Sequence, residues 1–434
     1  MNCEVTVDKI SYGGEGIART NNMVVFIPGA VPGDKLEIKL TEHKKNYARA
    51  EIVKIVEPSS RRIKPKCKYF NVCGGCSFQN IDYKEQLNIK KQIVEDSFFR
   101  FGKGLCVKVK DLICSEKKFG FRSKIQWVAK DNTLGLYKKG THNVIDIDYC
   151  FLADKKVNDL TSLIKRKLAG ADYKVLKHII IRESLYKDEF LAVFVLNSGK
   201  IEGFKKITEE LMSEFPGLAG VSANINEKIS NVILGDKNIL LEGEGYLEEK
   251  VDNLFFYYSG TLFFQVNTGQ LEKIIKIIRE NVLLTGNEVV LDLYSGVGAL
   301  SLHMAGECRK VILSEESPGA EEFFTKSANR NNITNVEFIT GKVEDFLDKF
   351  HKEGGSADLV ILDPPRKGCS DEVIRCLGLI KAPKIVYLSC NPVTLARDCK
   401  KLAGYGYKVN LIQPVDMFPQ TYHVEVLAVL ENKE

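Results

Sequence analysis

The chain has 434 residues, of which 44% are hydrophobic and 27% charged, with a formal net charge of +5. These values are typical of a globular protein with about two to four domains. The chain contains no run of 18 apolar residues and no signal peptide, so we expect a cytoplasmic protein without a membrane partner. Its twelve cysteines are scattered irregularly, which favours reduced thiols, metal binding or catalysis over a disulfide framework.

Residues 1–58 are predicted to form a five-stranded β-barrel of the oligonucleotide-binding type. Strand-like runs at 5–10, 23–27, 35–40 and 48–55 alternate with glycine and proline turns at close, regular spacing. The segments Gly-Gly-Glu-Gly-Ile (13–17) and Val-Phe-Ile-Pro-Gly-Ala-Val-Pro-Gly-Asp (25–34) resemble the TRAM domain of RNA-modifying enzymes. The alternative is a β-barrel without a ligand.

A basic stretch follows the second half of this barrel. Residues 42–68 contain nine lysines or arginines against three acidic residues, an excess of six positive charges. Beside an RNA-binding module such a stretch is a candidate surface for phosphates. The alternative is an ordinary solvated face.

Four cysteines predict a closed metal site, and three of them lie within ten residues: Cys67, Cys73, Cys76 and, further along, Cys150. A Gly-Gly pair within the first group supplies tight backbone. No histidine stands between residues 43 and 142, which favours an all-thiolate shell and therefore zinc or an iron–sulfur cluster. The five-residue gap after the first cysteine mildly disfavours zinc, but spacing alone leaves both open.

Residues 59–261 are predicted to form a central α+β domain. Asp82 is a candidate N-cap for a helix to about Phe101, with Glu85 at its third position. Further helices are expected at 156–168 and 203–215, and strands at 124–129, 179–182 and 190–196. The run Phe-Arg-Ser-Lys (121–124) is either a basic and aromatic patch or an ordinary strand edge.

Residues 262–434 show the strand–helix alternation of an α/β fold with a doubly wound, Rossmann-like sheet. After a helix at 271–281, short apolar strands are expected at 288–293, 310–315, 335–340, 357–363 and 384–388. Two more, at 407–412 and 423–430, have no full helix between them, which predicts an antiparallel last strand. A seven-stranded methyltransferase-type sheet has this layout.

Two strand ends indicate a cofactor that carries a nucleoside. The first strand ends in a Gly-Val-Gly turn, and a following helix would offer its N-terminal N–H groups to a ligand. Glu315, at the end of the second strand, is placed to accept hydrogen bonds from both ribose hydroxyls. The fourth strand ends in Asp-Pro-Pro, at the neighbouring strand end where open sheets bind ligands.

Cys390 and Glu425 are candidates for chemistry. Cys390 follows a buried strand and precedes Asn-Pro, which turns the chain out of the sheet, so its thiol is accessible. The alternative for a single cysteine is a small buried hydrophobe. Glu425 interrupts an apolar run, a setting that raises the pKa of a carboxyl group toward that of a general base. The alternative is a residue at the surface of an edge strand.

Four segments together resemble the RNA (uracil-5-)-methyltransferase family: Asp-Leu-Tyr-Ser-Gly-Val-Gly (292–298), Asp-Pro-Pro-Arg-Lys-Gly (363–368), Ser-Cys-Asn-Pro-x-Thr-Leu-Ala-Arg-Asp (389–398) and Asp-Met-Phe-Pro-x-Thr-x-His-Val-Glu (416–425). The TRAM-like start and the four cysteines point to the branch that methylates 23S ribosomal RNA, because the transfer-RNA branch lacks both additions.

The resemblance assigns roles to particular residues. It implies that Cys390 is the nucleophile and Glu425 the base. It implies an S-adenosylmethionine site at Gln265, Tyr294, Glu315 and Asp363, and a [4Fe-4S] cluster on Cys67, Cys73, Cys76 and Cys150. Lys342 departs from the acidic or amide residue often found there, which weakens any inference about adenine contacts. The expected partner is large-subunit ribosomal RNA, and the expected state is a monomer.

The residue types fit this chemistry independently. C5 of uracil is a poor nucleophile, and a thiolate that adds to C6 makes C5 electron-rich, after which a base must remove the C5 proton. The alternatives are a transfer-RNA uracil methyltransferase, an amino-methyltransferase of adenine or cytosine, an RNA 5-methylcytosine enzyme, a radical enzyme with a TRAM domain and an RNA-binding protein without catalysis. Arg366 and Cys390 speak against the amino-methyltransferases.

Overall fold

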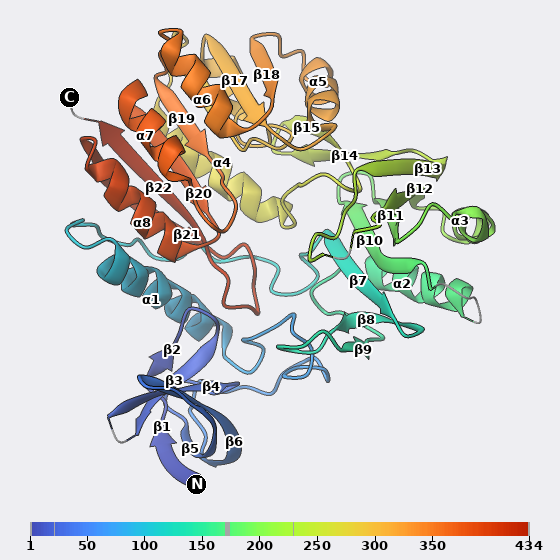
Figure 1. The fold of residues 1–434 in the computed structure, drawn as a ribbon, viewed down its shortest axis with the longest axis vertical. Helices are drawn as coiled ribbons and strands as arrows, with labels where there is room; N and C mark the ends of the chain where they lie inside the picture. Colours follow the sequence, from blue (N-terminus) through green and yellow to red (C-terminus); the bar gives the residue numbers. More distant parts are fainter. Residues whose placement is uncertain (1, 21, 170–173, 229, 433–434) are drawn as a thin grey trace.

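The computed structural model describes residues 2–20, 22–169, 174–228 and 230–432. It has three sheets of six or seven strands and one two-stranded hairpin. In Figure 1 the N-terminal sheet lies at the bottom left, the C-terminal sheet above it and the central sheet to the right, and loops from all three meet in the middle. Among the helices of the described residues, none combines the length and the apolar character that a membrane span requires.

The N-terminal barrel has six strands, because the predicted run 5–10 divides in two and one further strand was not predicted. Alternation of buried and outward side chains forms its core, as in β5, where Leu36 and Ile38 are fully buried between charged neighbours. The strands, in the order β1-β5-β6-β4-β3-β2, are β1 (Asn2–Thr6), β2 (Lys9–Ile10), β3 (Glu15–Thr20), β4 (Met23–Pro28), β5 (Lys35–His43) and β6 (Tyr47–Glu57).

Helix α1 (Tyr83–Phe101) begins as predicted, with the Asp82 carboxylate accepting a hydrogen bond from the Lys84 N–H. Although α1 lies in the predicted central domain, it packs against α8 (Pro392–Ala403) of the C-terminal region. The chain then runs along β21 (Tyr407–Val415), where Val109 and Ile113 pair with that strand and cover its edge. These residues connect the barrel to the C-terminal sheet (Figure 1).

The central sheet carries two helices on one face, α2 (Lys155–Leu168) and α3 (Glu202–Glu214), which share one apolar core with β10 and β11. Its strands, in the order β13-β12-β11-β10-β7-β8-β9, are β7 (Lys124–Lys130), β8 (Thr133–Tyr137), β9 (Val144–Asp146), β10 (Leu176–Ser184), β11 (Glu189–Leu196), β12 (Leu218–Ile225) and β13 (Lys237–Gly243). The hairpin of β14 (Tyr246–Val251) and β15 (Leu254–Ser259) leads from it into the C-terminal region.

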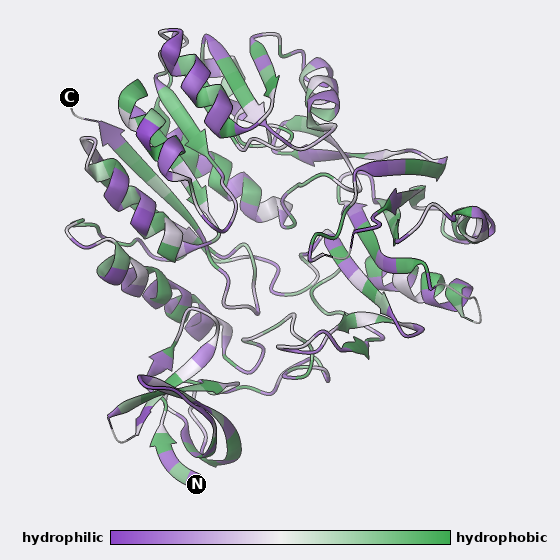
Figure 2. Cartoon of the chain, in the orientation of Figure 1, coloured by the Kyte–Doolittle hydropathy of each residue, from purple (hydrophilic) through white to green (hydrophobic). Residues whose placement is uncertain are grey.

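The C-terminal sheet has the predicted seven strands, in the order β18-β17-β16-β19-β20-β22-β21, and only β22 runs antiparallel to its neighbours. Its strands are β16 (Val289–Leu293), β17 (Lys310–Glu315), β18 (Val336–Thr340), β19 (Leu359–Leu362), β20 (Lys384–Ser389), β21 (Tyr407–Val415) and β22 (Glu425–Asn432). Figure 2 shows apolar strands in the middle and helices whose outer faces are hydrophilic.

The helices of this region are α4 (Thr268–Val282), η1 (Leu302–Glu307), α5 (Ala320–Arg330), α6 (Val343–Lys352), α7 (Asp371–Ile380) and α8 (Pro392–Ala403). One prediction here is wrong. The Gly-Val-Gly turn leads through further turns into the short 3-10 helix η1, and no α-helix begins there to offer its N-terminal N–H groups. The fold class, an α/β C-terminal sheet with an N-terminal barrel and a central α+β region, is as predicted.

Candidate active site at the carboxyl edge of the C-terminal sheet

A cavity lies at the carboxyl ends of β16 and β19, and three predicted cofactor residues line it: Gln265, Tyr294 and Asp363. Because β16 and β19 are parallel neighbours, Tyr294 and Asp363 follow their strands at the same edge. The Gln265 amide donates a hydrogen bond to Asp363 over 3.3 Å. The sequence therefore brings these three side chains from separate segments to one cavity.

Glu315, the fourth predicted cofactor residue, holds the glycine turn of this cavity. Its carboxylate accepts the backbone N–H groups of Gly296 at 2.9 Å and Ser317 at 2.8 Å. Gly296 itself lines the cavity and has a φ of +56°, which favours glycine. Glu315 thus fixes the turn in addition to the ribose-binding role that the sequence predicts.

Asp292 also lines the cavity, although no role was predicted for it. It is 1% exposed, and neither carboxylate oxygen makes a well-formed hydrogen bond among the described residues, although the hydroxyl and N–H of Ser301 lower its pKa. Burial, together with the charges of Asp363 and Glu315, raises the pKa of Asp292 to about 7. Burial likewise raises the pKa of Asp363 to about 7. A charged residue within an apolar strand was the signal that could have identified Asp292.

These carboxylates make the cavity suited to a cationic ligand. Unpaired buried oxygens are costly unless a ligand satisfies them, and carboxylates that repel one another are stabilised by a positive charge. The Ser295 hydroxyl beside them is also buried and without a partner among the described residues. S-adenosylmethionine, which carries a positive sulfur and an ammonium group, fits this donor set.

Cys390 and Glu425 lie together at the same edge. Ser389, the last residue of β20, pairs with Val426 of β22, so Cys390 stands beside the start of β22, where Glu425 lies. Cys390 is half-buried, whereas Glu425 is 3% exposed, so the alternative of a surface carboxylate does not hold. Burial and the nearby Asp363 raise the pKa of Glu425 well above its ordinary value.

The Cys390 thiol lies between charges of opposite sign. Burial and Glu425 raise its pKa, to about 11, while the positive charge of Arg366 lowers it. His423, two residues before Glu425, has a buried Nδ1 without a partner among the described residues, and burial lowers its pKa to about 4. The thiol is thus influenced by one cation, Arg366, and by the buried carboxyl group of Glu425.

The loop that carries Arg366 is fastened to α8. The Asn391 side chain donates to the Arg366 carbonyl at 2.9 Å, and the Asp398 carboxylate accepts the Cys369 N–H at 2.9 Å. Gly368 has a φ of +75°, and a Cβ there would lie 2.4 Å from an Asp398 oxygen. The motifs at 363–368 and 389–398 therefore form one unit that positions Arg366 beside Cys390.

The segment before Glu425 is held by the N-terminal half of the chain. Lys90 of α1 and Asp416 form a fully buried ion pair, and the Tyr83 hydroxyl donates to Asp416 at 2.8 Å. The Gln420 carbonyl accepts the N–H groups of Ser77 and Phe78, both at 3.0 Å. Residues 416–423, which we call the base loop, are thus bound to the segment that directly follows Cys76.

The four predicted metal ligands line one cavity: Cys67, Cys73, Cys76 and Cys150. The Gly75 N–H donates to the Cys73 sulfur at 3.3 Å, and the Gln79 amide to the Cys76 sulfur at 3.2 Å. Burial raises the pKa of Cys76 to about 12. Within the described ranges no three His, Cys, Asp or Glu side chains are arranged to hold a single metal ion.

The four cysteines offer the thiolate ligands that a zinc ion or an iron–sulfur cluster requires. A zinc ion draws four sulfurs to about 2.3 Å from a single point, whereas a cluster is bound by four thiolates spread around its volume. Sulfurs that surround a cavity and accept N–H donors suit the cluster. Apolar and aromatic side chains complete its lining, including Phe70, Leu136 and Ile147.

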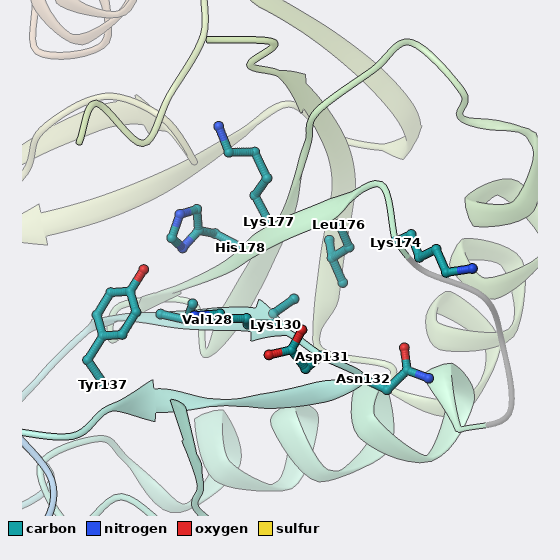
Figure 3. A pocket seen from close by; sticks show the side chains of 10 residues that line it. Val128, Lys130, Asp131, Asn132, Tyr137, Lys174, Leu176, Lys177 and His178 are labelled. Carbon is teal, nitrogen blue, oxygen red and sulfur yellow. The ribbon is translucent and has the colours of Figure 1, made fainter. Parts of the chain in front are cut away.

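Two basic surfaces differ in how far their charge is compensated. In the stretch 42–68, five of the nine cations form ion pairs: Lys44, Arg49, Arg61, Arg62 and Lys68. A groove of about 590 Å³ on the central sheet contains Lys130 and Lys177 beside Tyr137 and His178 (Figure 3). Both lysines donate hydrogen bonds to backbone carbonyls, which are neutral and therefore do not compensate the positive charge. No predicted site residue lines this groove.

Comparison with known proteins agrees with this architecture. The family model of tRNA (uracil-5-)-methyltransferases matches residues 82–433, and that of TRAM domains matches residues 2–53. An uncharacterized RNA methyltransferase of Caldanaerobacter subterraneus is 38% identical over 442 residues, covering 99% of this chain and 98% of the relative. One of Thermosynechococcus vestitus is 35% identical over 439 residues, covering 98% of this chain and 97% of the relative.

A solved structure also matches along the whole chain. The Pyrococcus abyssi tRNA (uracil-54, C5)-methyltransferase, in complex with S-adenosyl-L-homocysteine, superposes with a TM-score of 0.76 at 25% identity and covers 99% of this chain and 100% of its own. The family match spans most of the chain, and the fold and the strand-end motifs agree with it. The chain therefore belongs to the RNA (uracil-5-)-methyltransferase family and carries a TRAM domain in front of its methyltransferase fold.

Proposed function

We propose that this protein methylates C5 of a uridine in RNA, with Cys390 as nucleophile and Glu425 as base. The observation that carries the proposal is the position of Cys390, half-buried beside Glu425, under the positive charge of Arg366 and next to the cavity of Asp363. Covalent catalysis needs a nucleophile and a base within one site. Here each of the two groups also has a charged neighbour that shifts its pKa.

The reaction runs through a covalent intermediate. The Cys390 thiolate adds to C6 of uracil, and the electron pair of the C5–C6 double bond moves to C5 as an enolate. C5 then takes the methyl group. Glu425 removes the C5 proton, the double bond re-forms, and the thiolate leaves. Arg366 favours the thiolate that starts this sequence, since its charge opposes the rise in the Cys390 pKa.

The methyl donor in this proposal is S-adenosylmethionine, which supplies the methyl group on a positively charged sulfur. Gln265, Tyr294 and Asp363, which line the cavity with Asp292, would hold it together with Glu315, which fixes the glycine turn. Asp363 lies in the donor cavity and also influences the pKa values of Cys390 and Glu425. This carboxylate therefore links donor binding to the two groups that act on the uracil.

The proposed [4Fe-4S] cluster is held by Cys67, Cys73, Cys76 and Cys150, and its part is structural. The segment after Cys76 hydrogen-bonds to the base loop, so a fixed cysteine loop keeps Glu425 in place. Arg122 also offers a positive charge to the thiolates, since the charges of Cys150 and Cys76 act to raise its pKa. The cluster takes no part in methyl transfer in this proposal.

The proposed substrate is a uridine in large-subunit ribosomal RNA, and transfer RNA is the second candidate. The barrel does not distinguish the two substrates, because an archaeal transfer-RNA enzyme matches 99% of the chain, barrel included. Ribosomal RNA stays the first candidate on the resemblance that the four cysteines carry. In either RNA the base must leave its stack to reach Cys390.

The decisive experiment combines trapping with a choice of RNA. Transcripts of 23S ribosomal RNA fragments and of transfer RNAs, made with 5-fluorouridine, are incubated with the protein and S-adenosylmethionine. The fluorine cannot leave as a proton does, so we expect an adduct at Cys390, mapped by mass spectrometry, with one RNA class. Cys390→Ala must form no adduct, while Cys106→Ala, which removes an exposed thiol elsewhere, must form it. An unlabelled Cys390 in the wild type would refute the mechanism.

A further inference from the structure

The barrel extends a turn to the active site. Residues 11–15, between β2 and β3, form a tight turn in which the Gly14 N–H donates to the Ser11 carbonyl at 3.0 Å. Gly14 has a φ of +78°, and a Cβ there would lie 3.0 Å from the Tyr422 ring and 3.1 Å from the Ser77 side chain. This backbone thus lies directly against the base loop, at a contact that only glycine permits.

Tyr12, in the same turn, begins a chain of aromatic contacts that ends beside the base. Its ring meets the edge of Tyr422 with centroids 5.8 Å apart and planes at 89°. The Tyr422 ring in turn lies 4.2 Å from that of His423, two residues before Glu425. Burial, Tyr422 and the charges of Cys390 and Glu425 raise the pKa of Tyr12 to about 12. A residue of the barrel therefore lies close to the reacting groups.

These contacts leave part of the Tyr12 side chain exposed. It is 38% exposed, and its hydroxyl has no hydrogen-bond partner among the described residues. The contact with Tyr422 is perpendicular, and such a contact covers at most one of the two faces of the Tyr12 ring. A large aromatic ring that is partly exposed beside a site for RNA chemistry is the kind of surface on which unstacked bases pack.

We propose that Tyr12 stacks on the nucleobase next to the target uridine. The inference rests on the proposed function, since it supposes that a uridine leaves the RNA stack at Cys390. Removal of that uridine deprives the neighbouring base of a stacking partner, and an aromatic side chain can replace it. Tyr422 and His423 come between Tyr12 and Glu425, so Tyr12 is assigned to the neighbouring base and not to the target. The barrel thereby contributes to positioning the substrate as well as to gripping RNA.

The test uses the full-length protein and the RNA fragment that the wild type methylates. The base on the 5′ or the 3′ side of the target is replaced by 2-aminopurine, whose fluorescence falls when it stacks. Four proteins are compared: the wild type, Tyr12→Leu, Tyr12→Phe and Tyr405→Leu. Tyr405 is 37% exposed and follows the end of α8 opposite to the active site, so it matches Tyr12 in exposure. Binding, methylation kinetics and melting temperature are measured for each.

Tyr12→Leu is expected to bind the RNA about tenfold more weakly, with a raised KM, a nearly unchanged kcat and a wild-type melting temperature. It should also lose the stacking signal at one of the two positions, while Tyr12→Phe and Tyr405→Leu keep it. Wild-type RNA affinity and a wild-type stacking signal in Tyr12→Leu would overturn the inference. Equal losses of affinity and signal in Tyr12→Leu and Tyr12→Phe would also overturn it, because the Tyr12 hydroxyl and not its ring would then bind the RNA. If the wild type methylates no uridine at C5, the proposed function fails instead.

Discussion

Two sites in this molecule depend on cysteine, and they are built in opposite ways. Cys390 follows β20 in the middle of a seven-stranded sheet, so strand register brings it to Glu425. Cys67, Cys73, Cys76 and Cys150 lie outside the named helices and strands and meet at one cavity. A single thiol can take its position from regular structure, whereas four thiols on loops need a bound group to hold them.

The base loop connects the two sites. On one side it leads into Glu425, and on the other it hydrogen-bonds to the segment after Cys76. The comparison therefore predicts that changes at the catalytic edge alter chemistry and leave the fold intact, whereas changes around the cysteine cavity alter both. The predictions below test this division.

Glu425→Gln is expected to give the largest effect on turnover. The variant can still form the Cys390 adduct and transfer the methyl group, but it has no base for the C5 proton, so the methylated adduct accumulates. Steady-state methylation should fall about 10³-fold, as on loss of a general base. Denaturing gels and mass spectrometry of the RNA–protein adduct measure this. Glu431→Gln, at the far end of the same strand, is the control, and a freely turning-over Glu425→Gln would exclude its role as the base.

Cys76→Ala is expected to remove the proposed cluster. Protein purified without oxygen should lose its iron and visible absorbance, and its melting temperature should fall by several degrees, because the segment after Cys76 no longer holds the base loop. Methylation should fall with it. Cys106→Ala and Cys390→Ala should retain iron and stability. Wild-type iron content in Cys76→Ala would contradict the ligand assignment.

Lys90→Met breaks the buried pair that fixes the base loop to α1. Asp416 is then left charged and without its cation in a site that is fully buried, which should cost about 3–5 kcal/mol in the free energy of unfolding. Urea denaturation measures this cost.

Adding Asp416→Asn to Lys90→Met should restore part of the stability, because the uncompensated charge is gone while an acceptor for the Tyr83 hydroxyl remains. A double variant no more stable than Lys90→Met would show that the penalty comes from packing and not from charge.

The difference between regular strands and loops also decides which features could be predicted from the sequence. Periodicity placed β20 and β22, and therefore Cys390 and Glu425, because apolar strands and their ends follow from local pattern. It did not reveal β12 or β13, since Gly220, Ser222 and Asn224 interrupt the apolar residues of β12 and β13 is a largely exposed edge strand. Both owe their conformation to neighbours that are distant in sequence.

Pairings between distant residues were equally hidden. The contact of Asp398 with the Cys369 N–H, the ion pair of Lys90 with Asp416 and the approach of Tyr12 to Tyr422 join segments whose proximity only the fold defines. Motif spacing identified the groups that react, while the residues that hold them in place required the structure.

The smallest predicted effect is a pH dependence of donor binding. In the free protein, burial raises the pKa of both Asp292 and Asp363 to about 7, so at pH 6 these carboxyl groups are mostly protonated. A cationic donor favours the ionised form and must displace protons below that pH. The affinity for S-adenosylmethionine should therefore rise from pH 6 to pH 8 by about tenfold for each proton that the donor displaces, and change little above.

Calorimetry in buffers of different ionisation enthalpy counts the protons released and so tests this origin directly. Asp292→Asn should flatten the profile, because one of the two titrating groups is gone. S-adenosylhomocysteine should also show a shallower profile, since its sulfur carries no charge to compensate the carboxylates. An affinity for S-adenosylmethionine that is constant between pH 6 and pH 8 would mean that the cavity carboxylates are already ionised before the donor arrives. The positive charge of the donor would then contribute to affinity without displacing a proton from Asp292 or Asp363. The buried oxygens of Asp292 imply the opposite, namely that donor binding and deprotonation are coupled.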